Sequence, residues 1–245
     1  MKNSFTLFQC FFTFAMYLLG ACLLGVALVP SFILLLNAWN LVSPLNIYFK
    51  AVALSFSVGI GFFVFGVSLS LETIILRYLL NLKIREGEYG YFSLEAVKWA
   101  FVNAMILIVN LTFMDYMRLT PLLPFYYRLM GAKIGKRVQV NTKGIADVSL
   151  IEIGDDSVIG GDAVLIGHIA EHGKLKLKKT IIGQKVTVGL GAVIMPGSTI
   201  GNGSLIAARS VLSKNTIVPE KSLFAGTPAR FIKNLEADKI ESKTI

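Results

Sequence analysis

The chain has 245 residues, of which 54% are hydrophobic and only 16% are charged. Soluble globular domains carry about 25% charged residues, so this composition argues against an ordinary soluble protein, and the hydrophobic content excludes a disordered chain. Residues 1–117 hold six basic and five acidic residues, whereas residues 118–245 hold 18 basic and 10 acidic residues. An apolar, nearly neutral half therefore precedes a basic, polar half.

Two long apolar runs open the chain. The first, from Phe8 to Trp39, has no charged residue and exceeds the roughly 20 residues that cross a bilayer. It is also too long for a cleavable signal peptide, whose apolar region has about 7–15 residues. The second run extends from Ala51 to Leu80 and contains three glycines, which would let membrane helices approach closely. We expect two transmembrane helices joined by a polar turn.

A third apolar stretch, Trp99–Met114, is short for a span. Arg77 lies near the end of the second run and Lys83 and Arg85 follow it, and the positive-inside rule places a basic loop of this kind in the cytoplasm. If residues 99–114 crossed the bilayer, the strongly basic half would lie outside the cell. We therefore expect an interfacial or re-entrant helix here. Both termini and the polar half would then lie on the cytoplasmic side of the inner membrane.

The polar half repeats with a period of six residues. An aliphatic or aromatic residue recurs at positions 182, 188, 194, 200, 206, 212, 218 and 224, and a small or short residue follows four positions after most of them. Each hexad predicts one short strand and a tight corner, so three hexads make one triangular turn of a parallel β-helix. Such coils bury a continuous core only by stacking on one another. Between Val140 and Ile153 the register needs one extra residue, which predicts a bulge there.

One large insertion interrupts the hexads at residues 166–181. Both histidines of the protein, His168 and His172, lie in it, together with Glu171. Insertions in repeat proteins form loops on one face, which is often the binding face. A solvated loop with incidental histidines is the alternative, but the coincidence of both histidines with this insertion favours a functional loop.

The hexads, the looped-out histidine and the ending Phe224-Ala-Gly-Thr-Pro-Ala-Arg-Phe-Ile together resemble the hexapeptide-repeat acyltransferases, which fold as left-handed β-helices. Residues 83–91, residues 119–135 and His168-Ile-Ala-Glu-His-Gly also resemble the membrane-anchored C-terminal repeats of the ε-poly-L-lysine synthetases. The adenylation and carrier domains of those synthetases have no counterpart in this sequence. The resemblance implies a membrane-anchored acyltransferase with acetyl-CoA or another acyl-CoA as donor.

The resemblance also implies roles for individual residues. His168 would be the general base, with His172 as the rival base. Glu171 would orient the ring of His168, with Asp162 as the second choice. Residues implied for donor binding, on the terminal coils and their end, are Gly189, Gly191, Ala208, Ser213, Lys214 and Arg230.

These interpretations predict a membrane domain over residues 1–117, a connector over 118–133, the β-helix over 134–229 and a short helix and tail over 230–245. We expect no metal, because a zinc site of the carbonic anhydrase type needs three histidines and the chain has two. No nucleic-acid-binding motif accompanies the basic charge. The expected partners are the lipid bilayer, two further copies in a homotrimer, and a membrane-proximal acceptor: a lipid-linked sugar, a polysaccharide precursor or an amine.

Two other functions stay open from the sequence. One is an amide-forming partner of a carrier-protein synthetase system, which would accept aminoacyl groups from a carrier protein instead of CoA. The other is a non-catalytic trimeric scaffold in the membrane. Activity that survives the loss of both histidines would favour the scaffold.

Overall fold

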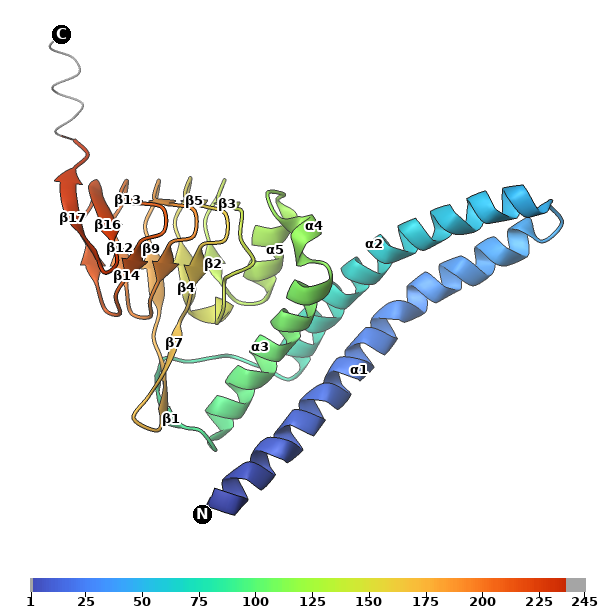
Figure 1. Cartoon of the computed structure of the whole chain (residues 1–245), viewed down its shortest axis with the longest axis horizontal. Coiled ribbons are helices and arrows are strands. Elements are labelled where there is room, and N and C mark those ends of the chain that lie inside the picture. Colours follow the sequence, from blue (N-terminus) through green and yellow to red (C-terminus); the bar gives the residue numbers. More distant parts are fainter. Residues whose placement is uncertain (1, 237–245) are drawn as a thin grey trace, which may run out of the picture. The chain divides into compact units, whose positions relative to one another are not determined.

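A computed structural model of the chain describes residues 2–236 and divides it into two compact units (Figure 1). The first unit comprises the chain up to Leu80 together with Ala104–Phe113. The second comprises Asn81–Asn103 together with the chain from Met114 onward.

The first unit is built on two long antiparallel helices, α1 (Lys2–Val42) and α2 (Ile47–Leu79). Asn46 caps α2, because its side-chain oxygen accepts hydrogen bonds from the amides of Tyr48 and Phe49 at 3.1 and 3.2 Å. Both helices are apolar and long enough to cross a membrane, as the sequence predicted. Pro30 lies inside α1, which remains one continuous helix.

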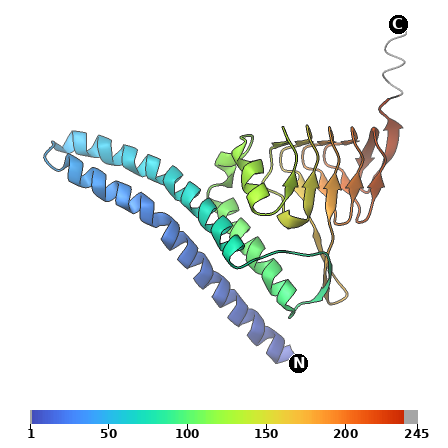
Figure 2. The ribbon, with the colours of Figure 1, turned by 180° about the vertical axis from the view of Figure 1, so that it is seen from behind.

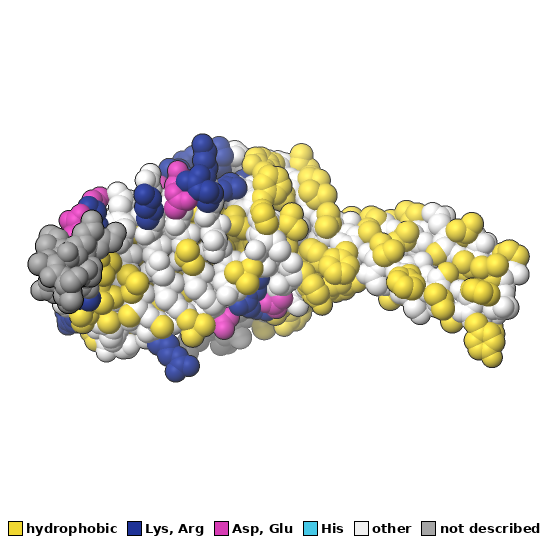
Figure 3. All heavy atoms as spheres, turned by 90° about the horizontal axis from the view of Figure 1, so that it is seen from above, with side chains coloured by type: hydrophobic (Ala, Val, Ile, Leu, Met, Phe, Trp, Pro, Cys, Tyr) yellow, Lys and Arg dark blue, Asp and Glu magenta, His cyan; other side chains and the backbone are white. Residues whose placement is uncertain are grey.

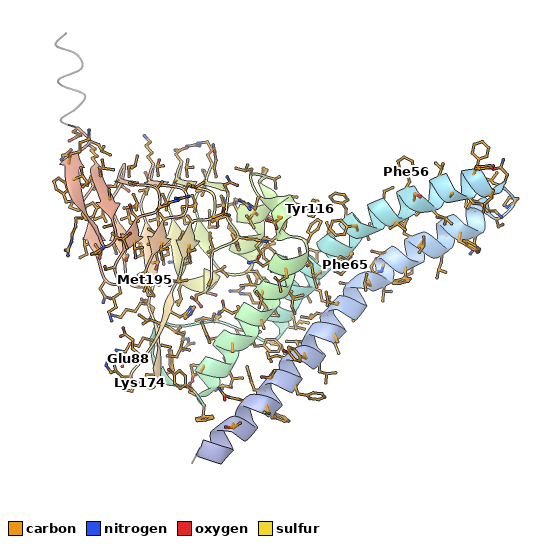
Figure 4. The ribbon with its side chains drawn as sticks, viewed as in Figure 1. Phe56, Phe65, Glu88, Tyr116, Lys174 and Met195 are labelled. Atoms are coloured by element: carbon orange, nitrogen blue, oxygen red, sulfur yellow. The ribbon has the colours of Figure 1, made fainter. Side chains whose placement is uncertain are left out.

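Small and polar residues make up most of the buried positions on α2, and many large apolar residues of the first unit are exposed. Ser57, Gly61, Gly66, Ser70 and Thr73 are buried on α2, and the Ser31 hydroxyl donates a hydrogen bond to the Gly61 carbonyl at 2.7 Å. A side chain at Gly66 would collide with the ring of Phe113. Hydrophobic side chains such as Phe56 cover the outer surface (Figures 3 and 4). This distribution suits helices that pack closely within lipid.

Helix α3 (Leu94–Thr112) is also apolar and long enough to span a membrane by length and composition. However, strand β1 (Gly87–Gly90), which precedes α3, pairs antiparallel with strand β8 (Lys174–Leu177), which follows it in the chain. A spanning α3 would place these two strands on opposite sides of the bilayer, where they could not pair. Our expectation of an interfacial or re-entrant helix at this position stays a prediction.

The second unit continues through α4 (Met114–Met117) and α5 (Leu122–Leu129) into a left-handed parallel β-helix with three faces (Figure 2). One face contains β2 (Lys133–Ile134), β4 (Ile151–Ile153), β9 (Thr180–Ile182), β12 (Thr199–Ile200) and β15 (Ile217–Val218). The second contains β3 (Gln139–Val140), β5 (Val158–Ile159), β10 (Thr187–Val188), β13 (Leu205–Ile206), β16 (Ser222–Gly226) and β17 (Ala229–Asn234). The third contains β6 (Val164–Leu165), β11 (Val193–Ile194) and β14 (Val211–Leu212).

The hexad residues form the core of these coils. Ile159, Leu165, Val188, Ile194 and Leu212 are fully buried, and each lies at the inward position of its strand. The small residues four positions later are mostly buried just after each turn, where several serine hydroxyls donate hydrogen bonds to carbonyl groups of the next coil. The period predicted from the sequence is therefore the period of the core.

The insertion at 166–181 forms a β-hairpin of β7 (His168–Glu171) and β8, and β1 extends it to a three-stranded sheet. Ion pairs reinforce this sheet: Glu88 lies 3.7 Å from Lys174 and 3.5 Å from Lys176, and the first of these pairs is visible in Figure 4. The Lys179 amide donates a hydrogen bond to the Glu86 carboxylate at 2.9 Å. The insertion is thus an ordered hairpin held by a segment about 90 residues earlier in the chain.

The end of the coils differs from the prediction. We expected a helix over 230–245, but Ala229–Asn234 form strand β17, which folds back antiparallel onto β16. This strand covers the hydrogen-bonding edge of β16, which would otherwise be open. The remainder of the predicted tail, residues 237–245, lies outside the described residues.

Candidate active site

His168 stands at the base of the hairpin and contacts a buried carboxylate. It is the first residue of β7, and its Nδ1 lies 2.6 Å from Oδ2 of Asp147. About a third of the His168 side chain is exposed, whereas Asp147 is completely buried. Asp147 lies in the bulge between Val140 and Ile153, at a φ of 54° immediately before a short 3-10 helix, η1 (Val148–Leu150).

Hydrogen-bond donors surround Asp147. Its Oδ1 accepts from Trp99 Nε1 at 2.5 Å and from Asn103 Nδ2 at 3.0 Å, and its Oδ2 accepts from the Gly167 amide at 2.9 Å. Donors of this kind stabilise an ionised carboxylate and offset the cost of burying its charge. The buried charge is therefore held in one orientation, with Oδ2 directed at His168.

This geometry determines the state of the imidazole. With an ionised carboxylate at Nδ1, the proton of neutral His168 resides on Nδ1, so that Nε2 carries the free lone pair. The hydrogen bond to Asp147 raises the pKa of His168 above the usual value for histidine, and burial opposes this rise. The ring also makes an edge contact with Trp99, with the centroids 4.9 Å apart. This arrangement orients the ring and leaves Nε2 able to accept a proton.

The other residues predicted for base catalysis lie elsewhere. Glu171, expected to orient His168, instead pairs with Lys214 and lies 3.7 Å from Lys176, and these cations lower its pKa. His172 is exposed at the hairpin tip with a φ of 50°, and Gly173 follows at 73°. Positive φ at both positions is typical of a two-residue hairpin turn, so the turn accounts for His172. Asp162, the second choice as orienter, is exposed and lies 3.5 Å from Arg118.

The residues predicted to bind the donor do not converge within one chain. Gly189, Gly191 and Ala208 lie at the corner between the second and third faces, where the Gly189 backbone packs against Ala208. Ser213 and Lys214 lie at the next corner, beyond β14, and Lys214 is held by Glu171. Arg230 is exposed on β17.

Within residues 2–236, no group of three or more His, Cys, Asp or Glu side chains is arranged to hold a metal ion.

Sequence reasoning missed Asp147, Trp99 and Asn103. The signal for Asp147 was the one-residue break in the hexad register, which predicted a bulge but no role for it. Trp99 and Asn103 are four positions apart, so they share one face of α3, but their sequence positions gave no link to the histidine loop.

Residues 179–214 match the family of the bacterial transferase hexapeptide (six repeats). These coils carry that family's repeat. The match supports an acyltransferase, as the sequence predicted. It covers the last three residues of the insertion, 179–181, and the coils that follow as far as residue 214.

Similar proteins extend the comparison. The δ-poly-L-ornithine synthetase of Acinetobacter baumannii is 23% identical over 206 residues, which is 84% of this chain but only 15% of that protein. A hexapeptide-repeat acetyltransferase from Vibrio cholerae is 30% identical over 43% of this chain and 64% of its own, with a TM-score of 0.39. A maltose O-acetyltransferase from Clostridium difficile is 22% identical over 61% of this chain and 93% of its own, with a TM-score of 0.47.

Proposed function

We propose that this chain is a membrane-anchored acyltransferase in which His168 is the general base. It would transfer an acyl group from a CoA thioester to a hydroxyl or amine of an acceptor at the membrane surface. The observation that carries the proposal is the contact between the half-buried His168 and the fully buried, donor-surrounded Asp147. The hexapeptide repeats, which belong to a transferase family, support the class of reaction.

The reaction follows from the free lone pair on Nε2. His168 would take the proton from the acceptor O–H or N–H as the acceptor attacks the thioester carbonyl. Asp147 would stabilise the imidazolium that forms. When the tetrahedral intermediate collapses, the C–S bond breaks and the imidazolium returns the proton to the departing CoA sulfur. The products are the acylated acceptor and free CoA.

The apolar helices support an acceptor at a bilayer. Helices α1 and α2 would anchor the chain, with the turn that joins them on the far side of the membrane and the β-helix on the cytoplasmic side. The basic residues that follow α2 favour this orientation. We further propose a homotrimer, in which corners of neighbouring chains could bring together donor-binding residues that lie apart in one chain.

A second candidate function is amide formation with an aminoacyl group supplied by a carrier protein. The similarity to δ-poly-L-ornithine synthetase over 84% of this chain favours it. Both functions use the same base, so the donor distinguishes them.

The test is steady-state kinetics on the full chain in detergent, with acetyl-CoA as donor and L-ornithine or octyl glucoside as acceptor probes. We expect His168→Ala to lower kcat by about 10²–10⁴-fold, the usual contribution of a general base, and His172→Ala to stay near wild type. Loss of activity only in His172→Ala would overturn the choice of base. Full activity in both variants would reject imidazole catalysis, and a wild-type chain that releases no CoA would reject the CoA donor.

A further inference from the structure

We infer that Trp99 and Asn103 on helix α3 are positioning residues, which hold the Asp147 carboxylate and thereby set the basicity of His168. The inference rests on the proposed function for its chemical meaning. It means that helix α3, which is not one of the hexapeptide coils, contributes residues to the site.

Asn103 binds both the side chain and the backbone of Asp147. Its Nδ2 donates to Oδ1 at 3.0 Å, and its Oδ1 accepts from the Asp147 amide at 3.1 Å. Nδ2 also donates to the Trp99 carbonyl one helical turn earlier, at 3.0 Å, which fixes the orientation of the amide group. Asn103 therefore holds Asp147 at two atoms, the carboxylate Oδ1 and the backbone amide, in the left-handed conformation at which the bulge turns.

Trp99 contacts both members of the pair. Its indole N–H donates to Oδ1 at 2.5 Å, and its ring packs edge-on against the imidazole. It thus fixes the carboxylate on one side and limits the rotation of His168 on the other. A phenylalanine at this position could keep the ring contact but not the hydrogen bond.

Packing of α3 alone does not require these polar contacts. Val102 and Met105 on the same helix are fully buried, and Ala96 is nearly so, which gives α3 an apolar contact surface of its own. Buried polar groups lower the free energy of unfolding unless all their hydrogen bonds are made. Stability alone therefore gives little reason to place a polar cluster beneath an apolar helix, and a role in the site gives a better one. Here Trp99 and Asn103 complete the hydrogen bonds to the buried Asp147 carboxylate, which faces His168.

Removal of a donor has a defined electrostatic result. The carboxylate loses part of the stabilisation of its negative charge and becomes a stronger acceptor for the imidazolium. The pKa of His168 should therefore rise further in Trp99→Phe and in Asn103→Leu. A neutral base would then be available only at higher pH.

The test measures the pKa of His168 without relying on activity. The full chain in detergent is treated with diethyl pyrocarbonate over a range of pH, and tandem mass spectrometry follows modification at each histidine. Exposed His172 is the reference within the same molecule. We expect the midpoint for His168 to rise by about half a pH unit to one pH unit in both variants, while that of His172 stays constant. The controls Trp39→Phe, on α1, and Asn110→Leu, further along α3, should leave both midpoints unchanged.

Kinetics then connect the midpoint to the reaction. The acidic limb of kcat/KM should move by the same amount as the His168 midpoint, and Asn103→Gln, which retains an amide, should move it less than Asn103→Leu. An unchanged midpoint in both variants would overturn the inference and leave only a structural role for these residues. The midpoint is measured whether or not His168→Ala remains active, so the inference and the proposed function can fail separately.

Discussion

Replacement of Asp147 by asparagine should abolish most of the activity while leaving the backbone undisturbed. The change is nearly isosteric, and asparagine tolerates the positive φ of this position about as well as aspartate does. However, an amide brings two N–H groups into a site where each oxygen of the carboxylate accepts from two donors. Whichever way the amide turns, its nitrogen meets groups that also donate.

The magnitude follows from the two possible orientations. If the nitrogen takes the place of Oδ2, it donates to Nδ1 of His168 and forces the ring proton onto Nε2, so the base loses its lone pair. A triad of this kind with the wrong tautomer loses about 10⁴-fold in kcat, and we expect a loss of about 10²–10⁴-fold. In that orientation the Gly167 amide loses its acceptor, and in the other orientation Trp99 and Asn103 lose theirs. At about 1–3 kcal/mol for each lost acceptor, the free energy of unfolding should fall by about 1–6 kcal/mol.

The assay compares kcat with thermal unfolding for Asp147→Asn and for a matched control. Asp162→Asn is suitable, because Asp162 also has a positive φ, of 53°, but is exposed. It should change stability by no more than about 0.5 kcal/mol and leave kcat near wild type. Near-normal kcat in folded Asp147→Asn would refute the role of Asp147, and a large loss in Asp162→Asn instead would show that the orienting carboxylate had been misassigned.

Two further predictions concern pH and topology. Because Asp147 raises the pKa of His168 above 6.5, the pair should contribute fully to stability below that pH and lose its contribution as pH rises through the raised value. The difference in Tm between wild type and His168→Gln should therefore shrink with rising pH, and a difference that grows would contradict it. With Cys10 and Cys22 replaced by serine, Ser43→Cys should react with an impermeant reagent added outside the cell and Lys185→Cys should not; equal labelling of both would reject the proposed orientation.

The sequence by itself determined the features that depend on local pattern. The hexad period fixed the coils, because only inward positions spaced by six residues can stack into one core, and residues such as Ile194 and Leu212 are fully buried there. The apolar runs predicted α1 and α2, because predominantly apolar stretches of that length suit a bilayer. The coincidence of His168 with the insertion identified the candidate base.

Tertiary structure alone decided what surrounds that base. Asp147 contacts Asn103 and Trp99, which lie 44 and 48 positions earlier in the sequence. It also contacts His168, which lies 21 positions later. Glu171 was the nearer carboxylate in sequence, but strand alternation and the hairpin turn direct it to Lys214 instead. The pairing of β1 with β8 was equally hidden. Contacts of this kind depend on how the bulge, the hairpin and α3 pack in three dimensions, and no local period encodes that packing.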